Sequence, residues 1–378
     1  MSERPGIPIG RLAGIPFYLA PSWFVIAILV CVLFAPTVTA AAEVGAAASY
    51  LVAAGFALLL LGSVLAHELA HALVARSLGL PVHQVVADLW GGHTQFTDLA
   101  PTPARTAGIA MAGPGANALV AAAGWWVLSL GAGDPQGLGG DGEVGAVVRL
   151  LVRALVYSNL LVAVFNLAPG LPLDGGRVVE AAVWALTGRR WVGTAAAAWL
   201  GRLVAVLVLA WAVLLPLATG RRPGLVTVVW VVLVCRMLWS GAGSALVASR
   251  WLRRAAGLDL RRYLRPAVAL PLTSTGWSGH GTQHVVSLDV DGRPVGVLGP
   301  ADAARLAEPG GPPSGTPLSA VLTVLGPGAV LPLTATAEQV LGALSTIAGP
   351  VLVVLGAEGA VAGVLDPAEL AAAITASA

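Results

Sequence analysis

Two histidines and a glutamate in one apolar stretch form the pattern with the clearest chemical potential. The sequence reads His67-Glu68-x-x-His71, so a helix through it would place both imidazoles one turn apart on the same face. Such a pair can hold one zinc ion, and Glu68, next to the first histidine, is placed to take a proton from water. The pattern therefore predicts a hydrolytic zinc site.

A third ligand has to come from elsewhere, because catalytic zinc sites take three protein ligands and keep a fourth position for water. Asp174 is the best candidate. It follows Pro169, Gly170 and Pro172, which interrupt an otherwise apolar helix. Irregular backbone at membrane depth is tolerated only beside protein or a wet cavity, so we expect Asp174 to complete the site.

The apolar surroundings of these four side chains make a chance occurrence a poor explanation. A charged side chain at the centre of a membrane helix costs on the order of 2.5–3.5 kcal/mol. One dication would offset the cost of placing His67, His71, Glu68 and Asp174 in an apolar span. The alternative interpretation is a set of polar core groups that satisfy one another.

The chain that must position these groups has the composition of a membrane protein. Of its 378 residues, 57% are hydrophobic and 11% are charged, and a formal net charge of +2 argues against a nucleic-acid partner. Cys31 and Cys235 both lie in apolar stretches, so no disulfide framework is expected. Stretches able to cross a hydrocarbon core of about 30 Å occur at 17–38, 50–77, 107–130, 148–168, 195–218 and 224–247. We expect an α-helical polytopic membrane protein with about six transmembrane helices.

The arginines indicate how these spans are oriented. Most of them, including the cluster from Arg250 to Arg265, fall on one side, which the positive-inside rule assigns to the cytoplasm. The acidic loop between the third and fourth spans falls on the other side. Four arginines do not follow this division: Arg149, Arg153, Arg221 and Arg222. We expect a multi-pass protein of the cell membrane, in contact with membrane lipid, with both termini in the cytoplasm.

These motifs resemble the site-2 protease family of intramembrane zinc metalloproteases. The resemblance rests on the His67-Glu68-x-x-His71 motif in an early span and on Leu173-Asp174-Gly175 in a later one. It covers about residues 7–250 and extends to two further motifs, Gly113-Pro114-x-x-Asn117 and Asn166-x-x-Pro169.

The resemblance implies a role for each of these residues. His67, His71 and Asp174 would bind Zn²⁺, Glu68 would be the general base, and peptide bonds in single-pass transmembrane helices would be cut. Asn117 and Asn166 would lie near the metal cavity, to polarise the scissile carbonyl or position the substrate. Interhelical hydrogen bonding is the alternative for both asparagines. Family analogy also suggests regulated intramembrane proteolysis of a membrane-anchored regulator, such as an anti-sigma factor.

The segment from Pro81 to Thr97, between the second and third spans, is predicted to form two short strands around Gly91-Gly92. A substrate helix must unwind before its amide can be cut, and an exposed strand edge could pair with it. We expect Gly91 and Gly92 to lie beside the substrate, with a simple connecting loop as the alternative. His83 and His93 are expected to be interfacial or loop residues, since a three-ligand site has no use for them.

A change of composition after Arg265 predicts a separate domain. Residues Val285–Leu298 and Val351–Leu365 each read as strand, turn and strand, followed by short Ala-rich helices at 302–308 and 369–375. Two such units in tandem predict a small α/β domain on the cytoplasmic side.

This domain, about 262–378, resembles a pair of cystathionine-β-synthase (CBS) domains, and 1–250 would be the transmembrane zinc metalloprotease domain. The nucleotide-binding pattern of CBS domains has Ser or Thr three positions before Asp; here the equivalents are Gly299-x-x-Asp302 and Asp366-x-x-Glu369. Asp302 could contact a ribose, whereas Asp366 would repel phosphate. A homodimerisation or substrate-docking role is therefore as well supported as binding of an adenine nucleotide.

Two other classes of function remain open. A metal transporter would use the same ligands as a translocation site, although transporters generally carry binding residues in both halves, and the sequence has no second His/Asp set. A non-catalytic membrane scaffold would need neither the ligands nor the base.

Overall fold

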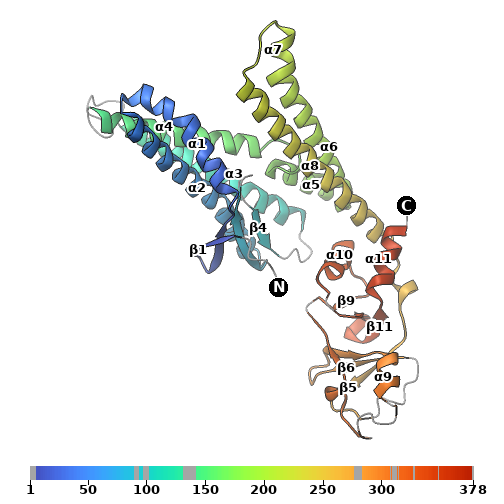
Figure 1. Ribbon diagram of the computed structural model, residues 1–378. Helices are drawn as coiled ribbons and strands as arrows, with labels where there is room; N and C mark the ends of the chain where they lie inside the picture. The colour runs from blue at the N-terminus through green and yellow to red at the C-terminus, as the bar shows by residue number, and fades with distance from the viewer. Residues whose placement is uncertain are drawn as a thin grey trace. The chain divides into compact units, whose positions relative to one another are not determined.

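The structure is a computed structural model that describes residues 6–88, 93–96, 102–130, 142–275, 283–306, 308, 313, 315–326, 328–347 and 349–376. Its contacts divide the chain into two compact units, Met1–Val247 and Ala248–Ala378. Figure 1 shows long helices in the first unit and small sheets with short helices in the second.

Among the described residues, six helices are long and apolar enough to cross a membrane, as the sequence predicts. They are α1 (Trp23–Ala42), α2 (Ala46–Ser77), α3 (Pro103–Leu130), α4 (Glu143–Asn166), α6 (Arg190–Leu209) continued through η1 (Ala210–Leu214) and α7 (Leu215–Ala218), and α8 (Leu225–Ala256). Large apolar side chains such as Leu51 and Trp125 are exposed on their outer faces. This surface suits lipid rather than water.

The first of these helices begins later than the predicted span 17–38. Residues Ile15–Leu19 form strand β2 instead, in which Ile15, Phe17 and Leu19 are buried in alternation. Pro21 disfavours helical conformation at the residue before it, so α1 starts only at Trp23 and runs on to Ala42. A short apolar run of this kind is a strand or a helix according to what covers it.

A four-stranded sheet lies beside α2 (Figure 1), in the order β1 (Ile7–Leu12), β2, β3 (Val82–Ala87) and β4 (His93–Phe96). The predicted pair β3/β4 is present and antiparallel, and β2 adds to β3 in parallel. Ile15, Phe17 and Val85 pack with Ala72 of α2. Burial of each larger side chain contributes about 1.5–3 kcal/mol. These contacts hold the sheet against α2 at the residue that follows His71.

The interrupted helix is also present as predicted. Helix α4 ends at Asn166, and α5 (Asp174–Thr187) begins after a seven-residue connection, 167–173. That connection lies against α6 so closely that a Cβ at Gly201 would overlap the carbonyl oxygen of Leu171. The contact fixes the start of α5, where Asp174 is the first residue.

The second unit repeats one arrangement of strands. Strand β5 (Ala267–Pro271) is parallel to β6 (His284–Leu288), which is antiparallel to β7 (Pro294–Leu298). In the same way β9 (Val330–Pro332) is parallel to β10 (Leu352–Leu355), which is antiparallel to β11 (Val361–Leu365). The other elements are η2 (Leu260–Tyr263), α9 (Pro300–Leu306), η4 (Leu318–Ala320), β8 (Thr323–Val324), α10 (Ala337–Thr346), η5 (Ala357–Gly359) and α11 (Pro367–Ala376).

Each β-β pair is followed by a short helix, α9 or α11, so both predicted strand-turn-strand units and their helices are confirmed. The assignment of the pair as CBS domains stays a prediction.

Candidate metal centre

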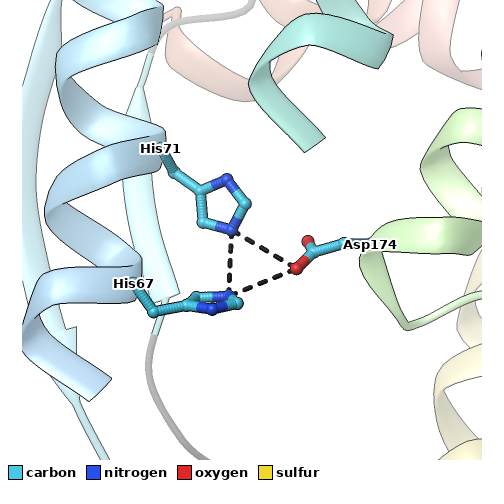
Figure 2. A group of neighbouring side chains, drawn as sticks. All are labelled: His67, His71 and Asp174. Carbon is cyan, nitrogen blue, oxygen red and sulfur yellow. Dashed lines mark hydrogen bonds and ion pairs between the residues drawn. The ribbon is translucent and has the colours of Figure 1, made fainter. Parts of the chain in front are cut away.

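Three side chains from two separate elements converge inside the helical unit. His67 and His71 project from one face of α2, and Asp174 stands at the first position of α5 (Figure 2). One oxygen of Asp174 lies 3.2 Å from Nε2 of His67 and 3.4 Å from Nε2 of His71. The two Nε2 atoms are 3.1 Å apart. The structure thus brings together the three residues that the sequence proposes as ligands.

The spacing of these atoms suits one zinc ion. Two ligands of a tetrahedral zinc with bonds of about 2.0–2.1 Å are roughly 3.3 Å apart, and the three distances between the side chains lie close to this value. Among the described residues, His67, His71 and Asp174 form a group of potential metal ligands, whose ligand atoms all lie within 4.8 Å of one another. The donor set is also one that zinc accepts.

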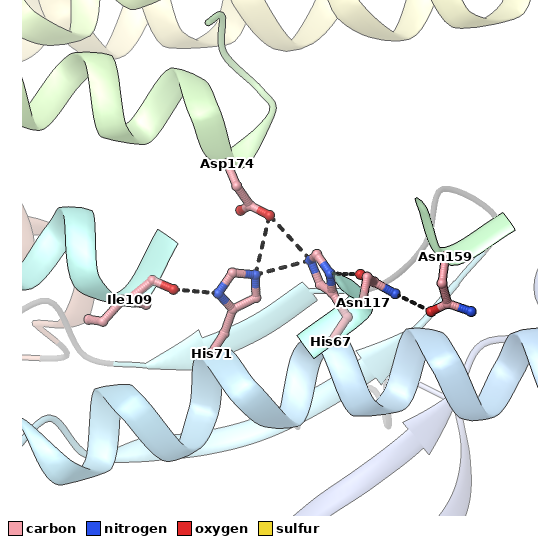
Figure 3. A network of polar contacts seen from close by, with 6 residues as sticks. All are labelled: His67, His71, Ile109, Asn117, Asn159 and Asp174. Atoms are coloured by element: carbon pink, nitrogen blue, oxygen red, sulfur yellow. Dashed lines mark hydrogen bonds and ion pairs between the residues drawn. The ribbon is translucent and has the colours of Figure 1, made fainter. Parts of the chain in front are cut away.

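The two imidazoles are oriented by hydrogen bonds on their far side (Figure 3). Nδ1 of His71 lies 2.7 Å from the carbonyl oxygen of Ile109, and Nδ1 of His67 lies 2.5 Å from Oδ1 of Asn117. A carbonyl oxygen only accepts, so Nδ1 of His71 carries the proton and its Nε2 presents a lone pair toward Asp174. Partners of this kind fix the tautomer of a metal-binding histidine.

Helix α3 approaches these imidazoles at Gly113, which lies between the two orienting residues Ile109 and Asn117. A Cβ built at Gly113 would overlap Nε2 of both His67 and His71. Because Gly113 has no side chain, there is room for the ligating nitrogens of both histidines. Gly113 belongs to the Gly-Pro-x-x-Asn motif, and this contact is a physical reason for glycine at that position.

A cavity of about 880 Å³ surrounds the three ligands. Glu68 is buried and lines it, as does Asn166 at the end of α4. Asp88, directly after strand β3, lines it too, so the end of β3 reaches the cavity. Its walls include apolar side chains of α1, α2 and α8, among them Trp23. This is a largely apolar chamber that opens beside a few polar groups, the usual form of a binding site.

Helices α5 and α6 are held together near the site by a buried carboxylate. Glu180 accepts hydrogen bonds from Nε of Arg190 at 3.2 Å and from Oγ1 of Thr194 at 2.7 Å. Arg190 also lines the cavity. The network fixes the helix that carries Asp174 against its neighbour.

Other predicted residues have more varied positions. Gly91 and Gly92 lie outside the described residues, and of His93 only the backbone is described, in β4. His83 is exposed in β3. Asn117 contacts His67 directly and Asn166 lines the cavity, so both lie near the ligands.

Sequence reasoning missed Asn159. It is buried in α4 and hydrogen-bonded to Asn117. A signal was present: Asn159 lies seven residues before Asn166, which puts both on one face of α4, and polar side chains inside an apolar span are candidates for function.

A family model and several known proteins match this chain. The sequence model of peptidase family M50 matches residues 55–146 and 141–211. A protein named as a zinc metalloprotease, Rip3, from two strains of Mycobacterium tuberculosis is 36% identical over 282 residues, 72% of this chain and 66% of the relative. A Synechocystis protein named as a zinc metalloprotease, sll0528, is 36% identical over 49% of this chain and 46% of the relative. The chain thus spans about two thirds or less of these relatives.

Among solved structures, a site-2 protease from Methanocaldococcus jannaschii is similar, with a TM-score of 0.41 and 22% identity. The match covers 64% of this chain and 94% of that one.

Proposed function

The chain belongs to peptidase family M50, and from that premise we propose that it is an intramembrane zinc endopeptidase that cuts transmembrane helices of membrane-anchored proteins. One observation carries the proposal: Asp174 and the two histidines of the His-Glu-x-x-His motif meet at zinc-ligand spacing, in a cavity among apolar helices. The fold alone would host other functions, so the proposal depends on the residues of the site.

Each residue has a defined task in this proposal. His67, His71 and Asp174 hold Zn²⁺. When bound there, the ion supplies a Lewis acid and lowers the pKa of water to about 7. Glu68 lines the same cavity; it accepts the proton of water as the oxygen adds to the scissile carbonyl. Glu68 then delivers that proton to the leaving amine as the C–N bond breaks, so the proton count balances.

The substrate has to be presented as an extended chain. Strand β4 is the last strand in the order of its sheet, and among the described residues no strand pairs with its outer edge. The end of β3 beside it reaches the cavity at Asp88. In this proposal the unwound substrate adds to the free edge of β4 by backbone hydrogen bonds, and Asn166 positions it at the metal centre.

Proline tests this pairing, because it removes a backbone donor. Thr94→Pro and Gln95→Pro are made singly. We expect at least one of them to keep wild-type zinc content and to show strongly reduced cleavage. Wild-type turnover in both would remove β4 from substrate binding.

Cleavage by purified protein tests the proposed function itself. The protein is reconstituted with a candidate single-pass substrate, and zinc content is measured alongside cleavage. We expect Glu68→Gln to retain zinc and lose cleavage, because an amide cannot take the proton. His67→Ala, His71→Ala and Asp174→Ala should lose both. A Glu68→Gln protein that still cuts would contradict the assignment.

Two further outcomes separate the rival functions. Zinc transport into proteoliposomes would favour a transporter. Zinc binding without cleavage of any substrate recovered by a Glu68→Gln trap would favour a scaffold. The same trap, followed by mass spectrometry, identifies the substrate; a membrane-anchored regulator such as an anti-sigma factor is the class expected from family analogy.

The second unit has a role that we propose separately. Its repeated β-β-α units suit a CBS-like pair, placed in the cytoplasm with both termini, and we favour homodimerisation or substrate docking. Arg265 is ion-paired with Asp366 at 3.1 Å and with Glu369 at 2.9 Å. This guanidinium is thus already engaged by carboxylates, which disfavours phosphate binding there. Calorimetric titration of the full chain with ATP and AMP tests this, and heat of binding would restore the nucleotide role.

A further inference from the structure

Asn159 is almost completely buried in α4, at 1% exposure, and all of its amide atoms are engaged. Its Nδ2 donates to the carbonyl oxygen of Leu155 at 2.9 Å and to Oγ of Ser63 at 3.0 Å. Its Oδ1 accepts from Nδ2 of Asn117 at 2.7 Å. Asn159 therefore stands between the backbone of α4 and the asparagine that contacts His67 (Figure 3).

The orientation of the Asn159 amide is imposed by its surroundings. The Leu155 carbonyl can only accept a hydrogen bond. Ser63 donates its single hydrogen to the carbonyl oxygen of Leu59 at 3.1 Å, which leaves its oxygen to accept from Nδ2 of Asn159. If the amide were flipped, its oxygen would face the carbonyl oxygen of Leu155, and the Ser63 hydroxyl would have to give up its bond to Leu59. Nδ2 therefore points to Leu155 and Ser63, and Oδ1 points to Asn117.

This orientation is passed on to the metal centre. Because Oδ1 of Asn159 is an acceptor, Asn117 must present Nδ2 to it and turn its own Oδ1 toward His67. His67 must then carry a proton on Nδ1, which leaves the lone pair of Nε2 facing Asp174. A flipped Asn117 would present a donor to Nδ1, and the imidazole would carry its proton on the ligating nitrogen.

We infer that Asn159 is a positioning residue that sets the tautomer of His67 through Asn117 and thereby the affinity of the site for zinc. The inference rests on His67 being a zinc ligand, as proposed above. His71 needs no such relay, because its partner is the backbone carbonyl of Ile109. Of the two histidines, only His67 depends on side chains for its tautomer.

The first test measures zinc affinity by competition with a chelator, on full-length protein in detergent. Asn159→Leu keeps a similar volume and removes every hydrogen bond of the amide. We expect a 10–100-fold weaker zinc affinity, the usual effect of losing an outer partner of a ligand. Ser49→Ala is the matched control: Ser49 is buried, and the change removes its partly buried hydrogen bond of 2.7 Å to Thr39, between α1 and α2 and away from the ligands. It should bind zinc like the wild type.

A double-mutant cycle separates the relay from a general structural effect. If Asn159 acts through Asn117, Asn117→Leu and Asn117→Leu/Asn159→Leu should lose the same affinity as Asn159→Leu alone, since residues in one chain of hydrogen bonds are not additive. Losses that add in the double variant overturn the inference.

Rescue provides the sharpest outcome. Aspartate at position 117 has no donor and can only accept from Nδ1 of His67, whatever stands at 159. We expect Asn117→Asp to restore the zinc affinity of Asn159→Leu to within about threefold of the wild type, through the carboxylate-histidine-metal arrangement.

An Asn159→Leu protein with wild-type affinity, or one that Asn117→Asp does not rescue, overturns the relay. If Asn159→Leu is not recovered as folded protein, Asn159→Ala takes its place. A wild-type protein that binds no zinc would instead contradict the proposed function. Failure of the relay and failure of the proposed function are therefore distinguishable.

Discussion

Gly113→Ala is the smallest change that should empty the metal centre. The added methyl group would overlap both ligating Nε2 atoms and would lie 2.6 Å from Cε1 of His67. Ordinary contact begins at 3.4 Å, so the His67 ring would have to move by about 0.8 Å, the difference between the two distances. Metal-ligand distances tolerate about 0.2 Å. A shift of this size removes His67 from the coordination sphere.

Withdrawal of α3 would not relieve the overlap at lower cost. The hydrogen bond from His71 to Ile109, one turn before Gly113, is 2.7 Å long. A retreat of about 0.8 Å would lengthen it to about 3.5 Å, beyond the range of a good N–H···O bond. We therefore expect zinc affinity to fall by more than about 100-fold, because a ligand itself is displaced and not only its outer partner. Cleavage should fall to background.

The assay compares Gly113→Ala with Gly115→Ala, two residues along the same helix, where a Cβ meets no atom within 4 Å. Alanine favours helix over glycine by about 1 kcal/mol, so neither variant should unfold α3. Zinc affinity by chelator competition, cleavage rate and thermal unfolding are measured for both. Wild-type zinc affinity in Gly113→Ala would refute the packing of α3 on the ligands, and equal losses in both variants would point to a general effect of alanine.

Three more expectations follow from other parts of the chain. Gly201→Ala should weaken zinc binding, because its Cβ would overlap the Leu171 carbonyl in the connection that leads to Asp174; Gly243→Ala, with no atom within 4 Å, is its control in a metal-affinity measurement. Removal of zinc by a chelator should lower the thermal midpoint of the helical unit, by the equivalent of about 2.7 kcal/mol when zinc stood at 100 times its dissociation constant; an unchanged midpoint would mean that no bound metal was lost. In the second unit, burial, reinforced by the positive charge of Arg265, lowers the pKa of His284 from its usual 6.5. The unfolded chain then binds the proton more readily, so the stability of this unit is fully present above about pH 6.5 and falls as the pH falls below it; the pH dependence of its unfolding should flatten in His284→Gln.

The number and kind of helices could be predicted because length and apolar composition decide them. The start of the first helix was predicted too early: Phe17 and Leu19 are as apolar as the residues of α1, but Pro21 disfavours helix just before α1, and pairing of β2 with β1 and β3 makes them a strand. The β1/β2 pair was missed for the same reason. Pairing partners distant in sequence leave no local period to detect.

At the site, the residues with costly side chains could be named in advance, and those that orient them could not. His67, His71 and Asp174 can be recognised in the sequence because each is a polar residue in an apolar stretch. Ile109 has no such signature, because it contributes a backbone carbonyl that every residue possesses. Asn159 was detectable as a polar residue, but its link to Asn117 depends on how α3 and α4 pack.

The packing of α3 on α2 brings both hydrogen-bond acceptors to the imidazoles. Ile109, Gly113 and Asn117 follow one another at intervals of four, as do His67 and His71, so both sets lie on single helix faces. The face of α3 offers an acceptor to His71 at one end, an acceptor to His67 at the other, and an empty position between them. A slip of α3 by one residue would rotate this face by about 100°, put side chains against the ligands and remove both acceptors. The register of these two helices is therefore a condition for metal binding, and substitutions that change it should reduce zinc affinity even at positions far from the cavity.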